Sequence, residues 1–133
     1  MHTPSSTGLA DMLPRATPLA RGYQYLPRII EQLKTLHPWK IILFGSHAYG
    51  TPDDDSDIDL LVILNSEEIP QSFQAKMQQK LTVRKAIWDV SKQVAIDLLV
   101  YTRPMYRKFQ ELDSMFAREI LQHGRILYET DNP

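Results

Sequence analysis

Three short apolar runs, each about as long as one β-strand, limit the folds open to this chain. They span residues 40–44 (KIILF), 57–64 (DIDLLVIL) and 94–101 (VAIDLLVY). The second run is continuously apolar after Asp59, which is typical of a strand that is buried on both faces of a sheet. Helical patterns lie before, between and after these runs. The order of elements predicts an α/β fold, a small mixed β-sheet flanked by helices.

The helical segments are defined by apolar residues at spacings of three and four. The first predicted helix covers about 25–36, and a long one covers 71–92. Another pattern runs from Met105 to Ile120 and is broken near Asp113, and residues 126–128 form a predicted edge strand. The long helix carries its main apolar stripe at Phe73, Met77, Leu81 and Trp88, with Val83, Ile87 and Val90 beside it, whereas the later stripe consists of Phe109, Leu112, Phe116 and Ile120. We expect the later stripe to be core, with part of it open to a dimer or partner interface.

Length and composition set the remaining limits. A chain of 133 residues allows one compact domain, which we expect over residues 22–133, after a proline-rich flexible tail over residues 1–21. The formal net charge of −1 argues against binding nucleic acid by overall positive charge, and cysteine is absent, which excludes thiolate chemistry. We find neither a spanning apolar stretch nor a secretory signal, so we expect a cytoplasmic protein.

Two of the predicted strands contain aspartates. Asp57 and Asp59 are two residues apart, so strand alternation points both side chains to the same face, and Asp97 lies inside an apolar run. A single aspartate in a strand is usually a cap or an ion-pair partner, but if the two strands are neighbours the three carboxylates converge. Such a cluster resists ionisation unless it holds a cation, and Mg²⁺ suits its oxygen donors. The preceding residues 53–55 (DDD) are interpreted as a solvated loop.

A turn at Gly45-Ser46 separates the first strand from a short helix that Gly50 is expected to end. A turn from strand to helix exposes backbone N–H groups that favour anions such as phosphate, although a plain N-cap serine gives the same pattern. The connection from Ser46 to Asp57 is short for a parallel crossover. We therefore expect an antiparallel pair that brings the turn next to the carboxylates.

The complete pattern consists of Gly45-Ser46, ten intervening residues, Asp57-x-Asp59, and Asp97 in a later strand. It resembles the signature of the DNA polymerase β-like nucleotidyltransferase superfamily, and the string FGSHAYGTPDDDSDIDLLVIL is similar to its minimal nucleotidyltransferase (MNT) branch. The resemblance extends from about residue 25 to residue 129.

The resemblance implies a role for each matching residue. Gly45 and Ser46 would bind the nucleotide phosphates, Asp57 and Asp59 would hold two magnesium ions, and Asp97 would complete the metal site and help to activate the acceptor hydroxyl. The implied reaction is attack of a hydroxyl on the α-phosphorus of ATP, with release of pyrophosphate. All five positions are intact.

The resemblance also suggests a partner. MNT proteins are often antitoxins of HEPN-domain ribonuclease toxins, which they neutralise by transferring AMP to a tyrosine of the toxin. One alternative is transfer to a small-molecule hydroxyl, as in the kanamycin nucleotidyltransferases. Another is an antitoxin that acts by binding alone. A homodimer is also open, whereas direct nucleic-acid binding is not expected.

Several other residues lie near the motif or carry a positive charge. His47 could touch a nucleotide, but we interpret it as a helix-surface residue, and Tyr49 as a residue that packs beneath the short helix. A further cation for the triphosphate is expected. Arg84, Lys85 and Lys92 are candidates that the sequence does not separate.

Overall fold

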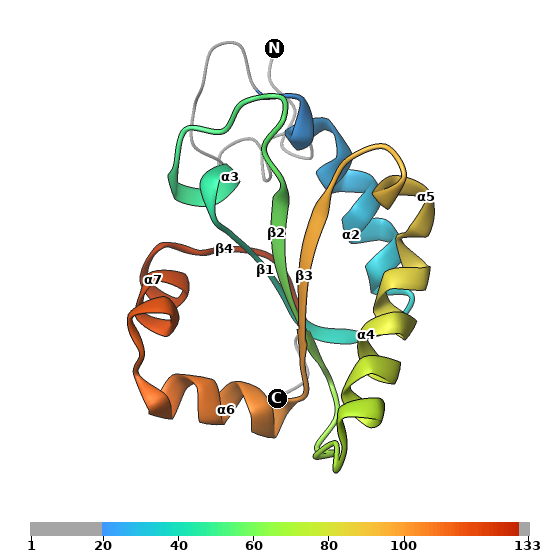
Figure 1. Ribbon diagram of the computed structural model, residues 1–133, viewed down its shortest axis with the longest axis vertical. Helices are drawn as coiled ribbons and strands as arrows, with labels where there is room; N and C mark the ends of the chain where they lie inside the picture. Colours follow the sequence, from blue (N-terminus) through green and yellow to red (C-terminus); the bar gives the residue numbers. More distant parts are fainter. Residues whose placement is uncertain (1–19, 131–133) are drawn as a thin grey trace.

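The structure is a computed structural model that describes residues 20–130. A four-stranded sheet forms its centre, and helices cover both faces (Figure 1). The strands are β1 (Pro38–Phe44), β2 (Ile58–Leu64), β3 (Ile96–Tyr101) and β4 (Arg125–Glu129). The helices are η2 (Arg21–Tyr25), α2 (Leu26–Lys34), α3 (Ser46–Tyr49), α4 (Phe73–Ala86), α5 (Trp88–Ser91), α6 (Arg103–Leu112) and α7 (Met115–His123). The predicted α/β class is confirmed.

The strands lie in the order β3-β2-β1-β4. β1 is antiparallel to both β2 and β4, as expected from the short connection through α3, whereas β2 and β3 are parallel. The helices α4 and α5 make the longer crossover that a parallel pair requires. The sheet is therefore mixed, and its centre is the buried pair β1 and β2.

Two apolar cores lie on the two faces of the sheet. One core joins alternate residues such as Ile41, Leu60 and Leu98 to α2 and α4. The other joins the residues between them, such as Ile42 and Leu61, to α6 and α7. Figure 1 shows α2, α4 and α5 on one side of the sheet and α6 and α7 on the other. Because both faces are covered, the central strands are apolar along nearly their whole length.

The long predicted helix divides into α4 and α5 at Ile87, and its main stripe does not face the core. Val83, Ile87 and Val90 are buried, whereas the four larger residues of the expected stripe are exposed: Phe73, Met77, Leu81 and Trp88. Periodicity identifies an apolar stripe on a helix but not the side that packs, and here the smaller, β-branched residues fit against the sheet. The stripe of larger residues therefore lies on the exposed side of the helix.

The break between α6 and α7 lies at Asp113, as predicted, where the backbone enters the left-handed region at φ 50°. Ser114 then caps α7 by accepting a hydrogen bond from the N–H of Ala117 at 3.0 Å. Ile120 is buried in the second core, but Leu112 and Phe116 are exposed. The stripe of the two helices is thus only partly core.

Most of the expected tail, residues 1–19, lies outside the described residues. Its last two residues pack on the domain: Ala20 is buried, and the backbone N–H of Arg21 donates to Asp54 at 2.8 Å. No helix in the described part of the chain is long and apolar enough to cross a membrane.

Candidate active site

Asp59 and Asp97 face each other across the parallel pair of strands. Asp59 is the second residue of β2 and Asp97 the second of β3, and their Cα atoms are partners in the register. Asp57 lies two residues before Asp59, and alternation points it to the same face, the side of α6 and α7. Asp59 is half-buried, whereas Asp57 and Asp97 are exposed. The sequence prediction that these carboxylates meet therefore holds for Asp59 and Asp97, with Asp57 at the entrance to β2.

The electrostatics of this group centre on Asp59. Burial raises the pKa of Asp59 to about 6, and the charges of Asp97 and Asp57, together with a side-chain hydrogen bond to Asp97, act in the same direction. An ionised pair at this position is therefore unfavourable unless a proton or a cation lies between the oxygens.

The donor set fits a divalent cation in its chemistry. The oxygens of Asp57, Asp59 and Asp97 are hard donors, and the repulsion between them is the kind that a bound Mg²⁺ relieves. Within residues 20–130, however, no three acidic or histidine side chains are yet gathered closely enough to form a metal-binding group. The structure thus brings the carboxylates to one place without closing them into a cage.

Gly45 provides the turn beside these carboxylates. Its backbone has φ 70° and ψ −156°, a region that is essentially limited to glycine. A Cβ at this position would lie only 2.0 Å from Oδ2 of Asp59. Glycine is therefore needed both for the backbone conformation and for the close approach of the carboxylate.

The turn leads directly into α3. The carbonyl of Gly45 accepts from the N–H groups of Ala48 and Tyr49, at 3.0 and 3.1 Å. The N–H groups of Ser46 and His47, which precede them, have no hydrogen-bond partner among residues 20–130. Free N–H groups at such a turn are suitable donors for an anion. Gly50 ends the helix, as predicted.

His47 is fully buried, so the interpretation as a surface residue was wrong. Its Nδ1 lies 3.0 Å from the carbonyl oxygen of Asp57, and its ring makes an edge contact with Tyr23 at 5.0 Å. The hydroxyl of Tyr23 donates to the backbone carbonyl of His47 at 2.9 Å. Burial lowers the pKa of His47, which favours a neutral ring that donates from Nδ1. His47 thus fixes the backbone that carries Asp57.

The burial of His47 depends on Gly22. A Cβ on Gly22 would lie 2.4 Å from Nε2 of His47. No local pattern in the sequence connects these residues, which are 25 positions apart. Sequence reasoning therefore missed this support of the site, and only the packing of η2 against α3 reveals it.

Tyr49 is half-buried and contacts both cores, as the packing interpretation predicted. Its hydroxyl also reaches the turn. Burial raises the pKa of Tyr49, a hydrogen bond from the Gly45 backbone opposes that shift, and the charges of Glu119 and Asp59 add to it. Tyr49 therefore connects the turn, the carboxylates and α7.

The candidate cations differ in their positions. Arg84 donates from Nη1 to the carbonyl of Ile96 at 3.1 Å, directly before Asp97, whereas Lys85 and Lys92 are exposed. Arg84 is thus held near the start of β3, although its partner there is a backbone carbonyl. The predicted loop at residues 53–55 is exposed, as expected.

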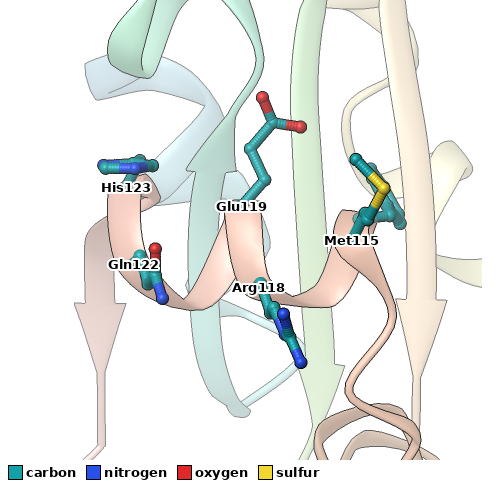
Figure 2. Close-up of a pocket in the computed structure, with 6 residues that line it drawn as sticks. Met115, Arg118, Glu119, Gln122 and His123 are labelled. Atoms are coloured by element: carbon teal, nitrogen blue, oxygen red, sulfur yellow. The ribbon is translucent and has the colours of Figure 1, made fainter.

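A shallow depression of about 570 Å³ lies over α7 (Figure 2). Glu119 and Met115 point to one side of the helix, and Arg118 and Gln122 point to the other. His123 makes a ring contact with Tyr49 at 5.9 Å, which joins the depression to the site. The depression therefore adjoins Tyr49 at the edge of the site.

Comparison with known proteins shows the family of the chain. Residues 26–127 match the nucleotidyltransferase domain family. The chain is 30% identical, over 89 residues, to a protein of Methanocaldococcus jannaschii named as a candidate protein adenylyltransferase, covering 67% of this chain and 77% of that protein.

Solved structures show a similar fold. A candidate nucleotidyltransferase from Sulfolobus solfataricus aligns with a TM-score of 0.53 at 17% identity, covering 82% of this chain and 84% of that one. A toxin-antitoxin structure with AMP-PNP overlaps less, with a TM-score of 0.48 at 21% identity over 80% of this chain and 74% of that one. The family match covers both the Gly45 turn and all three aspartates, and the chain therefore belongs to the nucleotidyltransferase family.

Proposed function

We propose that this nucleotidyltransferase transfers AMP from ATP to a tyrosine hydroxyl of a partner protein, a HEPN-domain ribonuclease toxin, and thereby neutralises it. The observation that carries the proposal is the register of Asp59 with Asp97 beside the Gly45 turn. This arrangement offers an anion-binding turn next to paired carboxylates. A relative named for protein adenylyltransferase activity supports a protein as the acceptor.

Magnesium is the cofactor that the donor set suits best. Asp57, Asp59 and Asp97 would hold two ions, and these would supply positive charge where negative charge develops on the reacting phosphate. The raised pKa of Asp59 supports this assignment, because its environment disfavours an uncompensated negative charge.

The chain itself would bind and orient the reactants. The N–H groups of Ser46 and His47, which are free among residues 20–130, would donate to phosphate oxygens of the nucleotide. The acceptor oxygen forms a bond to the α-phosphorus, and the bond from that phosphorus to pyrophosphate breaks. The proton of the hydroxyl passes to a carboxylate, a role that the family resemblance gives to Asp97.

The open surface supports a folded acceptor. The depression over α7 is shallow and lined by residues of that helix, so it offers an open surface rather than an enclosure for a small molecule. A partner that presents its own tyrosine meets this requirement. We place the reaction in the cytoplasm, where ATP is available.

The test is transfer to a defined partner. The purified chain is incubated with ATP, Mg²⁺ and the product of the reading frame next to its own gene, and the intact mass of that protein is measured. We expect an increase equal to one or more AMP groups, located on tyrosine by fragmentation, and no increase when EDTA is present. An unchanged partner mass, with active proteins, would overturn the proposal.

Matched variants assign the residues. Asp97→Asn and Asp57→Asn should abolish transfer with the fold intact, because each removes a carboxylate of the site. Asp55→Asn changes an exposed aspartate of the adjacent loop in the same way and should retain full activity.

Rescue in cells separates the alternatives. If Asp57→Ala still neutralised the toxin completely, the chain would act by binding alone. If ATP were consumed with an aminoglycoside and not with the partner, the acceptor would be a small molecule.

A further inference from the structure

A row of large apolar side chains faces solvent along α4 and α5. Phe73, Met77, Leu81 and Trp88, here called the α4 ridge, are exposed by 76%, 47%, 45% and 54%. Phe73, Met77 and Leu81 follow one another at spacings of four residues, so they line one side of α4 over a length of about 12 Å. Exposed apolar residues in such a row mark an interaction surface more often than a free one.

Positive charge surrounds the α4 ridge. Between positions 69 and 88 the sequence has four lysine and arginine residues, Lys76, Lys80, Arg84 and Lys85, and neither aspartate nor glutamate. Nζ of Lys92 lies 5.7 Å from the ring centre of Trp88. The chain as a whole has a net charge of −1, so this local excess is opposite in sign to the rest of the molecule.

The lysines next to the α4 ridge form no ion pairs in the described part of the chain. Lys76, Lys80, Lys85 and Lys92 form no ion pair with any residue between 20 and 130. Other basic residues of the domain do form ion pairs, namely Arg28, Lys34, Lys40, Arg103, Arg107 and Arg118. The α4 ridge therefore combines an uncovered apolar centre with cations that have no counter-charge in this part of the chain.

The α4 ridge lies on the face of the sheet opposite to the carboxylates, which point to the side of α6 and α7. α4 packs against β3, which is the edge strand of the sheet next to β2. Arg84 of α4 donates to Ile96, the residue before Asp97. Figure 1 shows α5 and the start of β3 at the same end of the molecule. A partner on the α4 ridge would thus contact the helix that covers the edge strand β3, and its hydroxyl would reach Asp97 around that edge.

We propose that the α4 ridge is the docking surface for an acidic, helical surface of the partner protein that brings the acceptor hydroxyl. This inference rests on the proposed function. Side chains at spacings of four residues fit the groove between two helices, and carboxylates at the rim of that groove would pair with Lys76, Lys80 and Lys85.

The charges argue against other occupants. Two copies of the α4 ridge would bring like-charged lysines together, which disfavours a homodimer through this face. An anionic membrane would match the charge. However, about half of each of Met77 and Leu81 is already covered within the domain, which leaves a low ridge suited to a groove rather than a face that inserts into lipid.

The test measures binding of the purified product of the adjacent reading frame by isothermal titration calorimetry, with the full-length chain. Met77→Asp should weaken binding at least about 30-fold, because it places a charge in the apolar centre. Lys76→Gln with Lys80→Gln should weaken binding about 3- to 10-fold at low salt and much less at high salt.

Matched controls change an exposed apolar residue and an exposed lysine elsewhere on the domain. Leu121→Asp replaces an exposed leucine of α7, and Lys34→Gln replaces an exposed lysine of α2; both should bind like the wild type. Circular dichroism and thermal unfolding of every variant would show that the fold is retained.

Each other outcome overturns the docking proposal. The proposal is wrong if Met77→Asp binds the partner as tightly as the wild type, or if the wild-type chain does not bind the partner. It is also wrong if the wild type forms a homodimer that Met77→Asp dissociates, or if the wild type binds phosphatidylglycerol vesicles and Met77→Asp does not. Adenylyl transfer is assayed separately. Transfer that does not depend on the α4 ridge would refute the docking proposal alone, whereas ridge-dependent binding without transfer would refute the proposed function alone.

Discussion

The contact between Gly45 and Asp59 can be tested by adding one methyl group. In Gly45→Ala, the new Cβ would lie 2.0 Å from Oδ2 and 2.8 Å from Cγ of Asp59, so the carboxyl group must move. The backbone of residue 45 also lies in a region that costs a residue with a side chain about 1–3 kcal/mol. We expect a total loss of about 2–5 kcal/mol in the free energy of unfolding, the sum of backbone strain and steric overlap.

A double-mutant cycle separates these two contributions. In an Asp59→Ala background the overlapping carboxyl atoms are gone, and the nearest remaining atom, Cβ of residue 59, lies 3.2 Å from the new methyl group. The cost of Gly45→Ala should then fall to the backbone contribution of about 1–3 kcal/mol. The coupling between the two substitutions is expected to be about 1–2 kcal/mol.

Urea unfolding of the wild type, both single variants and the double variant measures this coupling. Gly50→Ala is the matched control, because its Cβ would meet Cα of Ser46 at 2.9 Å and not Asp59. Its cost should be the same in both backgrounds. If Gly45→Ala also cost the same in both, the carboxylate would not lie against the turn, and our account of the site would be refuted.

Three further substitutions test the surroundings of the site. Because the folded-state pKa of Asp59 is raised to about 6, ionisation destabilises the fold as the pH rises from about 4 through 6. In thermal unfolding without metal, Asp59→Asn should therefore be more stable than the wild type by about 1 kcal/mol at pH 7.5. The two proteins should be equally stable near pH 4. The value of about 1 kcal/mol takes into account that solvent partly screens the half-exposed Asp59. His47→Ala should cost about 2–4 kcal/mol in urea unfolding, since it empties a buried position and removes the bond to the Asp57 carbonyl; a cost under about 1 kcal/mol would contradict that burial. Tyr23→Phe removes the hydroxyl that donates to His47 and should cost about 1 kcal/mol, and an unchanged urea midpoint would count against this bond.

The strands and their carboxylates could be predicted because the relevant signals are local. The period of two places Asp57 and Asp59 on one face, and the short connection from Gly45 makes β1 and β2 antiparallel. The pairing of Asp59 with Asp97 depends on the neighbour relation of two strands, which the sequence allowed but did not require. The structure supplies this relation through the parallel register of β2 and β3.

The remaining features depend on contacts between distant segments. His47 is buried because Gly22 leaves space for its ring, and neither residue alone predicts the other. The packed side of α4 depends on which side chains fit against β3. Val83 fits there and Met77 does not, although both belong to apolar stripes of the same helix.

These features together explain why the fold holds the carboxylates close together although their ionised forms are unfavourable there. Asp59 lies half-buried against Asp97, at a turn that only glycine allows, so its ionised form carries a cost that a bound cation would remove. The buried ring of His47 contacts the carbonyl oxygen of Asp57 through Nδ1 and thereby fixes the backbone at the entrance to β2. A cation that binds the carboxylates should therefore stabilise the fold itself, and it should do so more strongly in the wild type than in Asp59→Asn.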